Sequence, residues 1–179
     1  GHVHSPTTVP YRANIHALKS LGVTDIISLG EHDKSTILGI AASLEQHSSH
    51  IIGQSILKYA REQKVSVSDI DNFQNIAGQG VKAKIDGKEY FAGNERLIQG
   101  LNLKFDAPKD TMGTLVFVAN AEKVFGYIVL ADAIKESSKI AVQKLHDMGV
   151  KVAMLTGDNE QVARAVSEEL GIDTYFANV

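Results

Sequence analysis

The sequence predicts a mixed α/β fold, in which an antiparallel sheet carries a helix hairpin and leads into a partial α/β unit. Two neighbouring runs, residues 36–46 and 50–63, place apolar residues at helical spacing. Between residues 73 and 130 the apolar period shortens to two, and turns rich in glycine separate the runs. Residues 151–170 follow the order strand, tight turn, helix. Together these patterns predict the fold class α/β (α+β).

The first 22 residues are interpreted as an N-terminal tail or a segment left from expression. Residues 1–10 are polar and rich in turn formers, which is typical of a chain end outside the core. Residues 13–21 have the pattern of a short helix that ends at Gly22. Residues 23–29 are rich in β-branched side chains and predict the first strand.

The predicted helix hairpin has recognisable caps. Asp33 or Ser35 can cap the first helix, and Ser48 and Ser49 end it and can cap the second. Asp33 also begins the sequence DKST, which we interpret as a helix start.

The predicted sheet rests on its turns. Asp86-Gly87 is a strong two-residue hairpin signal between residues 81–85 and 88–92. Residues 114–119 and 124–130 form a second strand pair around a polar turn. Since successive antiparallel strands pair with each other, we expect one sheet with the two helices on one of its faces.

The period changes again near Leu130. A helix over residues 135–148 ends at Gly149 and leads into a strand and a second helix, as in a parallel sheet. The predicted domains are therefore residues 1–22, 23–130 and 131–179.

The turn between the strand and helix of residues 151–170 could bind a phosphate. Free N–H groups and the positive end of a helix dipole meet there. Thr156 adds a hydroxyl donor, Gly157 allows close approach, and Asp158 tolerates a phosphate only with a divalent cation between them. The alternative is that Asp158 or Asn159 merely caps the helix.

Composition excludes several classes of function. A net charge of -3 and a pI near 6.2 give no support for nucleic-acid binding. The absence of cysteine excludes disulfides and thiolate metal sites, and we predict no metal-ligating residue in this chain. No apolar run approaches the ~18 residues of a membrane span.

Three features of the middle region could carry chemistry. The pair Gly78 and Gly80 leaves a loop without bulk, where backbone N–H groups could meet a ribose or phosphate. Gly93-Asn94 ends a strand and is most often a plain turn. Glu45 and His50 flank the hairpin and could share a pocket, although each alone is ordinarily a surface residue.

The combination resembles the heavy-metal-transporting P-type ATPases. The features that carry the resemblance are Glu45, SSHII at residues 48–52, the Gly78-Gln79-Gly80 loop, Gly93-Asn94, LADAIK at 130–135 and MLTGDN at 154–159. Their order and spacing agree over residues 23–179.

The resemblance implies a nucleotide-binding domain joined to part of a haloacid-dehalogenase-like phosphorylation domain, in the cytoplasmic part of an integral membrane protein. It implies ATP and Mg²⁺ as cofactors, and ATP, ADP and the pump's membrane, actuator and remaining phosphorylation domains as partners. It assigns Glu45 and His50 to the adenine and Gly78, Gly80, Gly93 and Asn94 to the ATP pocket. Thr156, Gly157 and Asp158 are implied to lie at the phosphorylation site.

Two departures from the family pattern affect function. Ile51 follows His50 where the family has proline, which leaves the helix entry less fixed. The family's phosphorylated aspartate, in the motif DKTGT, and its later magnesium loop GDGxND are not found in this sequence. We therefore expect a fragment that binds ATP without turning it over.

The leading hypothesis is the ATP-binding part of a metal-exporting pump, with copper as the preferred metal. One alternative is a regulatory module that binds adenine nucleotides without hydrolysis. Another is a haloacid-dehalogenase-like phosphatase, which requires an N-terminal DxD nucleophile that the sequence does not show.

Overall fold

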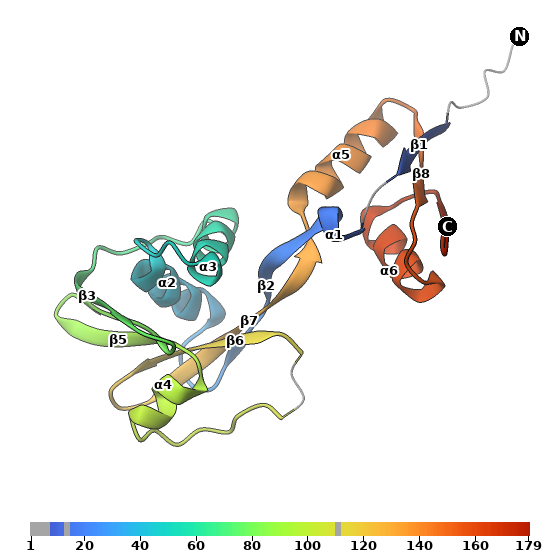
Figure 1. The fold of residues 1–179 in the computed structure, drawn as a ribbon. Helices are drawn as coiled ribbons and strands as arrows, with labels where there is room; N and C mark the ends of the chain where they lie inside the picture. Colours follow the sequence, from blue (N-terminus) through green and yellow to red (C-terminus); the bar gives the residue numbers. More distant parts are fainter. Residues whose placement is uncertain (1–7, 13–14, 110–111) are drawn as a thin grey trace, which may run out of the picture. The chain divides into compact units, whose positions relative to one another are not determined.

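The chain forms two compact units in the computed structural model, which describes residues 8–12, 15–109 and 112–179. One unit is Leu21–Asp132, called here the sheet unit, and the other combines Gly1–Ser20 with Ala133–Val179, called here the terminal unit (Figure 1). Within the described ranges, no helix has the length and apolar character needed to cross a membrane.

The sheet unit is built on a six-stranded sheet with the order β2-β7-β6-β5-β4-β3. The pairs from β7 to β3 are antiparallel, as the sequence predicts. Its strands are β2 (Lys19–Ser28), β3 (Asp71–Ile76), β4 (Gly80–Ile85), β5 (Lys88–Gly93), β6 (Thr114–Asn120) and β7 (Val124–Ile134). Asp86 and Gly87 both have positive φ, 50° and 78°, which is the backbone that a tight two-residue hairpin requires.

Two helices cover one face of this sheet and a short helix lies against the other. Helices α2 (Lys34–Glu45) and α3 (Ile51–Glu62) pack onto the face that contains Val116 and Val118. Helix α4 (Glu95–Gly100) lies against the opposite face, where Ile98 meets Phe117. Strand alternation separates these two cores, because neighbouring residues of β6 point to opposite faces. The predicted helix hairpin on the antiparallel sheet is thus confirmed (Figure 1).

The terminal unit is a small parallel α/β structure. Its sheet has the order β1-β8-β9, with strands β1 (Thr8–Arg12), β8 (Lys151–Leu155) and β9 (Thr174–Phe176). Its helices are α1 (Ile15–Leu18), α5 (Glu136–Asp147) and α6 (Glu160–Leu170). Met154 of β8 is fully buried among residues of α6 such as Ala163 and Val166. The predicted strand, turn and helix of residues 151–170 is present.

The prediction that residues 1–22 form a tail is wrong for the described part of that segment. Residues 8–12 form β1, which pairs in parallel with β8 from Thr8↔Lys151 to Arg12↔Leu155. Pro10 obscures this strand in the sequence, and it is tolerated because β1 is an edge strand. The core of the terminal unit also includes Ile15 and Leu18. Residues 1–7 lie outside the described residues.

Candidate functional site

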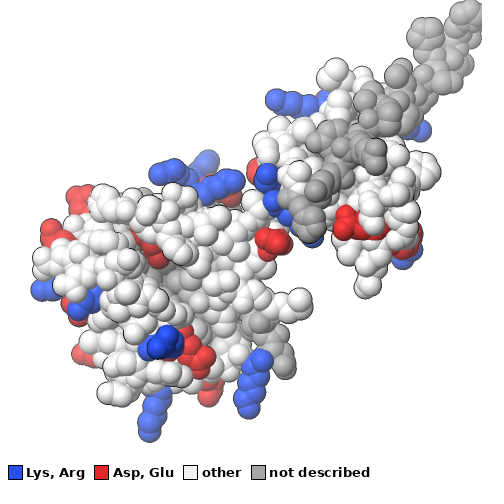
Figure 2. Space-filling model, in the orientation of Figure 1, with Lys and Arg blue, Asp and Glu red and all other residues white. Residues whose placement is uncertain are grey.

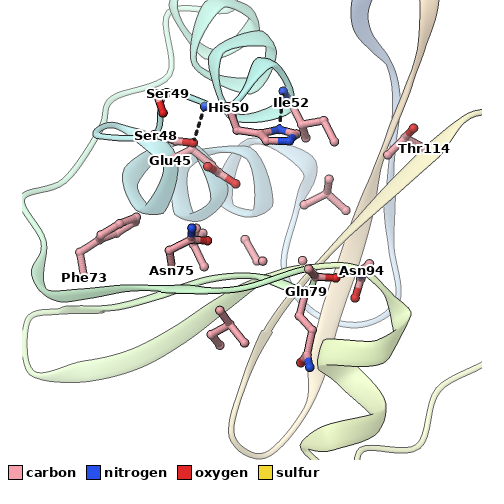
Figure 3. A pocket seen from close by; sticks show the side chains of 18 of the residues that line it. Glu45, Ser48, Ser49, His50, Ile52, Phe73, Asn75, Gln79, Asn94 and Thr114 are labelled. Carbon is pink, nitrogen blue, oxygen red and sulfur yellow. Dashed lines mark hydrogen bonds between the residues drawn. The ribbon is translucent and has the colours of Figure 1, made fainter.

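A pocket of about 650 Å³ lies in the sheet unit, between the α2–α3 connection and the strands β3, β4 and β5 (Figure 3). Its size falls in the range of small-molecule sites. The residues lining it include all six that the family resemblance assigns to nucleotide binding: Glu45, His50, Gly78, Gly80, Gly93 and Asn94. The fold thus brings together residues from four separate stretches of the chain.

One wall of the pocket is bare backbone. Gly80 of β4 and Gly93 of β5 are direct cross-strand partners. A Cβ atom added at Gly80 would lie 2.2 Å from the Ala92 carbonyl oxygen, and one added at Gly93 would lie 2.3 Å from the Gln79 carbonyl oxygen. Because backbone cannot move away as a flexible side chain can, only glycine fits at these two positions.

Asn94 holds the glycine loop in place. Its Nδ2 donates to the Gly78 carbonyl oxygen over 2.8 Å, and its backbone N–H donates to the Gln79 carbonyl oxygen over 2.8 Å. Its Oδ1 accepts from the Leu97 N–H and caps α4. Asn94 therefore acts on the shape of the pocket through the loop, and it is more than the plain turn residue that its position suggests.

Glu45 places a buried carboxyl group in the pocket wall. It is the last residue of α2 and only 6% exposed. Gly53 on the facing turn of α3 makes room for it, because a Cβ there would lie 2.4 Å from Glu45 Oε2. Burial raises the pKa of Glu45, while the hydrogen bond with Ser48 and the charge of His50 lower it. Gly53 is a residue that periodicity alone does not reveal.

His50 caps the second helix with its ring. The ring Nδ1 of His50 accepts from the Ile52 N–H over 3.3 Å, and the backbone N–H of His50 donates to Ser48 Oγ over 3.2 Å (Figure 3). In the neutral ring the hydrogen then sits on Nε2. His50 itself is exposed to solvent. Ile51 is the first residue of α3 and is 61% exposed, a position whose N–H needs no partner within the helix.

The Thr156 loop lies in the terminal unit and is not part of this pocket. Thr156 is buried, and its Oγ1 donates to Asp158 Oδ2 over 2.5 Å and accepts from the Asp158 N–H. Gly157 is exposed, and Asn159 caps α6 by accepting from the Val162 N–H. The helix cap is therefore Asn159, which leaves the Asp158 carboxylate held by Thr156.

Mg²⁺ finds no complete set of ligands in this loop. Mg²⁺ prefers several oxygen ligands in octahedral geometry. Asp158 is the one carboxylate of the sequence TGDN. Across residues 8–12, 15–109 and 112–179, no group of three His, Cys, Asp or Glu residues is arranged to hold a metal ion. A Mg²⁺ ion beside Asp158 would therefore need further oxygen ligands from water or from a phosphate group.

Comparison with known proteins first defines the class. The family model for haloacid dehalogenase-like hydrolases matches residues 12–179. A copper-exporting P-type ATPase B of Archaeoglobus fulgidus is 39% identical over 162 residues, covering 88% of this chain and 23% of the relative. A cadmium, zinc and cobalt-transporting ATPase of Bacillus subtilis is 38% identical over 161 residues, covering 89% of this chain and 23% of the relative. The chain thus spans about a quarter of the length of these relatives.

Solved structures agree with this class. A zinc-transporting P-type ATPase of the PIB class, crystallised in its E2.Pi state, matches 97% of this chain and 29% of its own chain, with a TM-score of 0.56 and 25% identity. The N-domain of a copper-transporting P-type ATPase matches 62% of this chain and 99% of its own, with a TM-score of 0.53 and 22% identity, and shows the likeness of fold. The chain belongs to the haloacid dehalogenase-like hydrolase family, and within it the chain is similar to the heavy-metal-transporting P-type ATPases.

Proposed function

We propose that this chain is the ATP-binding part of a heavy-metal pump, that the sheet unit binds the nucleotide, and that the terminal unit contributes part of the phosphorylation domain. The observation that carries the proposal is that one pocket is lined by all six residues Glu45, His50, Gly78, Gly80, Gly93 and Asn94. In the parent protein these units would lie on the cytoplasmic side, joined to membrane, actuator and further phosphorylation domains.

The chemistry of the pocket suits an adenosine group. The exposed imidazole of His50 offers a flat surface to a purine ring, and the Glu45 carboxylate can accept from an exocyclic amine. The glycine wall allows a ribose to approach the backbone of β4 and β5 closely. These contacts describe recognition of the base and sugar.

We expect replacement of His50 by asparagine to weaken ATP binding at least about fivefold, because stacking on an aromatic side chain contributes ~1–3 kcal/mol per base. Asparagine retains the helix cap, so the free energy of unfolding should stay within about 0.5 kcal/mol of wild type. Titration calorimetry with ATP and denaturant unfolding measure the two effects. Equal ATP affinities of wild type and His50→Asn would refute the adenine contact.

The pocket lining contains no lysine or arginine. Phosphate groups gain most from such cations, so we place the phosphates outside the pocket, toward solvent. We expect ATP, ADP and AMP to bind with dissociation constants within about fivefold of one another, because each phosphate contributes little. The same titration in EDTA should give an unchanged ATP affinity. A hundredfold preference for ATP over AMP would show that the phosphates are bound directly.

In the intact pump we propose that the Thr156 loop lies beside the phosphorylated aspartate of the parent protein, with a divalent cation between the phosphoryl group and the Asp158 carboxylate. Thr156 fixes the orientation of the Asp158 carboxylate, and the exposed Gly157 leaves backbone accessible. The 179-residue chain alone is expected to bind ATP without hydrolysing it. Phosphate release from ATP by this chain would contradict that expectation.

For the transported ion we propose copper. The Archaeoglobus relative carries copper in its name, whereas the Bacillus relative is named for cadmium, zinc and cobalt. No Cys lies in this chain, and we propose that residues elsewhere in the pump select the metal. ATPase activity of the parent protein, measured with each metal in turn, decides between them.

A further inference from the structure

The edge strand β3 places an unassigned amide in the pocket. Asn75 lines the pocket and pairs with Val81, a buried pocket residue of the neighbouring strand β4. Phe73, two residues earlier, lines the pocket as well, whereas Gln74 between them does not; Ile76, at the end of β3, also reaches the pocket. Because side chains two apart on a strand share a face, Phe73 and Asn75 lie on the side of β3 that faces the pocket. β3 therefore contributes a second wall to the pocket, opposite the helix hairpin.

Two polar side chains of the pocket already have partners within the protein. The His50 ring accepts from Ile52, and the Asn94 amide binds Gly78 and Leu97. Among the hydrogen bonds of the described residues, none involves the side-chain amide of Asn75, which is exposed to the pocket. Figure 3 shows this amide pointing up from β3 toward the Glu45 carboxyl, while the Gln79 side chain points away from the helices. Glu45 and Asn75 thus approach the same space from opposite walls.

A carboxylate and an amide complement one edge of adenine. Adenine carries an amine donor at N6 beside an acceptor at N1, whereas hypoxanthine carries an acceptor at O6 beside a donor at N1. The Glu45 carboxylate can only accept, which fits the N6 amine. An acceptor at N1 then needs a neighbouring donor, and the Asn75 amide has two N–H groups to offer.

We propose that Asn75 is a specificity-determining residue that donates to N1 of adenine while Glu45 accepts from N6. The proposal rests on the proposed function, since it names how the same pocket recognises its base. It predicts that the identity of residue 75 sets the preference between ATP and inosine triphosphate.

The test measures ATP and inosine triphosphate binding by titration calorimetry on the 179-residue chain. We expect Asn75→Ala to weaken ATP binding roughly fivefold and to leave inosine triphosphate nearly unchanged. We expect Asn75→Asp, which replaces the donor with an acceptor, to weaken ATP binding further and to strengthen inosine triphosphate binding, because hypoxanthine donates from N1. Gln74→Ala is the matched control on the opposite face of β3, and both affinities should stay at wild-type values.

The outcomes separate the two proposals. Failure of the wild-type chain to bind ATP would overturn the proposed function itself. Normal ATP binding with an unchanged ATP to inosine triphosphate ratio in both Asn75 variants would overturn the role of Asn75 alone. A parallel loss of both ligands in Asn75→Ala and Asn75→Asp would also overturn it, since a purely structural role weakens both nucleotides together.

Discussion

Replacing Glu45 with methionine is expected to weaken ATP binding about tenfold or more at pH 7 and, at the same time, to raise the free energy of unfolding. Hydrogen bonds to charged groups contribute ~1.5–3 kcal/mol, and methionine offers no comparable acceptor. Methionine has an unbranched chain like glutamate, so it fits the space that Gly53 leaves. Stability rises because a buried carboxyl group is removed from an apolar environment. Opposite signs in the two measurements identify a residue kept for binding at the expense of stability.

Glu45→Gln and Glu62→Gln complete this series. Glu45→Gln retains shape and one acceptor oxygen, so its loss of ATP affinity should be smaller than that of Glu45→Met. Glu62 is exposed at the end of α3, and its replacement should change neither quantity. A Glu45→Met variant that binds ATP as wild type does, or that unfolds more easily at pH 7, would contradict the assignment.

The pH dependence of the stability gain provides an independent check on Glu45. Because burial raises the pKa of this carboxyl above its ordinary value of 4.5, the folded state binds the proton more tightly than the unfolded state. The wild-type contribution is therefore most favourable below that ordinary pKa and is lost as pH rises through the folded pKa. The advantage of Glu45→Met should be smallest at acid pH and largest above the folded pKa.

The sequence predicts the fold well where periodicity and turn chemistry agree. Asp86 and Gly87 adopt the turn that their types favour, and the first helix begins after Asp33, one of its two predicted caps. The second helix is capped by His50, and not by the predicted Ser48 or Ser49. Elements shorter than two turns escape such patterns. Gly93-Asn94 is interpreted from the sequence as a turn, and the six-residue helix α4 that follows is not predicted. Asn94 is a residue type that favours helix N-caps, and in the structure it accepts from the Leu97 N–H in that role.

The sequence indicates several residues that line the pocket, but it does not indicate how the helices and strands pack to form it. Family resemblance brings Glu45 and His50 to attention, but it does not say that Gly53 makes space for the carboxyl. That relation depends on how closely α2 and α3 pack, which one-dimensional patterns do not contain. Asn75 escapes for a related reason: an amide on an edge strand looks like a solvent-exposed residue until β3 is seen to form a wall of the pocket.

Gly93→Ala is expected to destabilise the sheet unit by about 3 kcal/mol, the upper range for overpacking a well-packed site. The added methyl group would lie 2.3 Å from the Gln79 carbonyl oxygen, 2.6 Å from Leu97 Cδ2 and 3.0 Å from Gly80 Cα. Two of these three atoms are backbone, so relief requires β4 and β5 to separate, and the Gly78–Gly80 loop to move with them. A loss of this size corresponds to a fall in Tm of roughly 10 °C for a chain of this length.

Gly100→Ala is the matched control for Gly93→Ala, because both change glycine to alanine near the ends of α4: Gly93 lies two residues before this helix, and Gly100 is its last residue. No atom lies within 4 Å of a Cβ at Gly100, so alanine there should be neutral or stabilising by up to ~1 kcal/mol. Denaturant unfolding of the two variants with and without ATP measures both effects, since saturating ATP should add less stability to Gly93→Ala than to Gly100→Ala if the glycine wall also contacts the nucleotide. Equal stability of the two variants would mean that β4 and β5 can separate at little cost, and the pocket would then lack the rigid backbone wall on which close approach of a ribose depends.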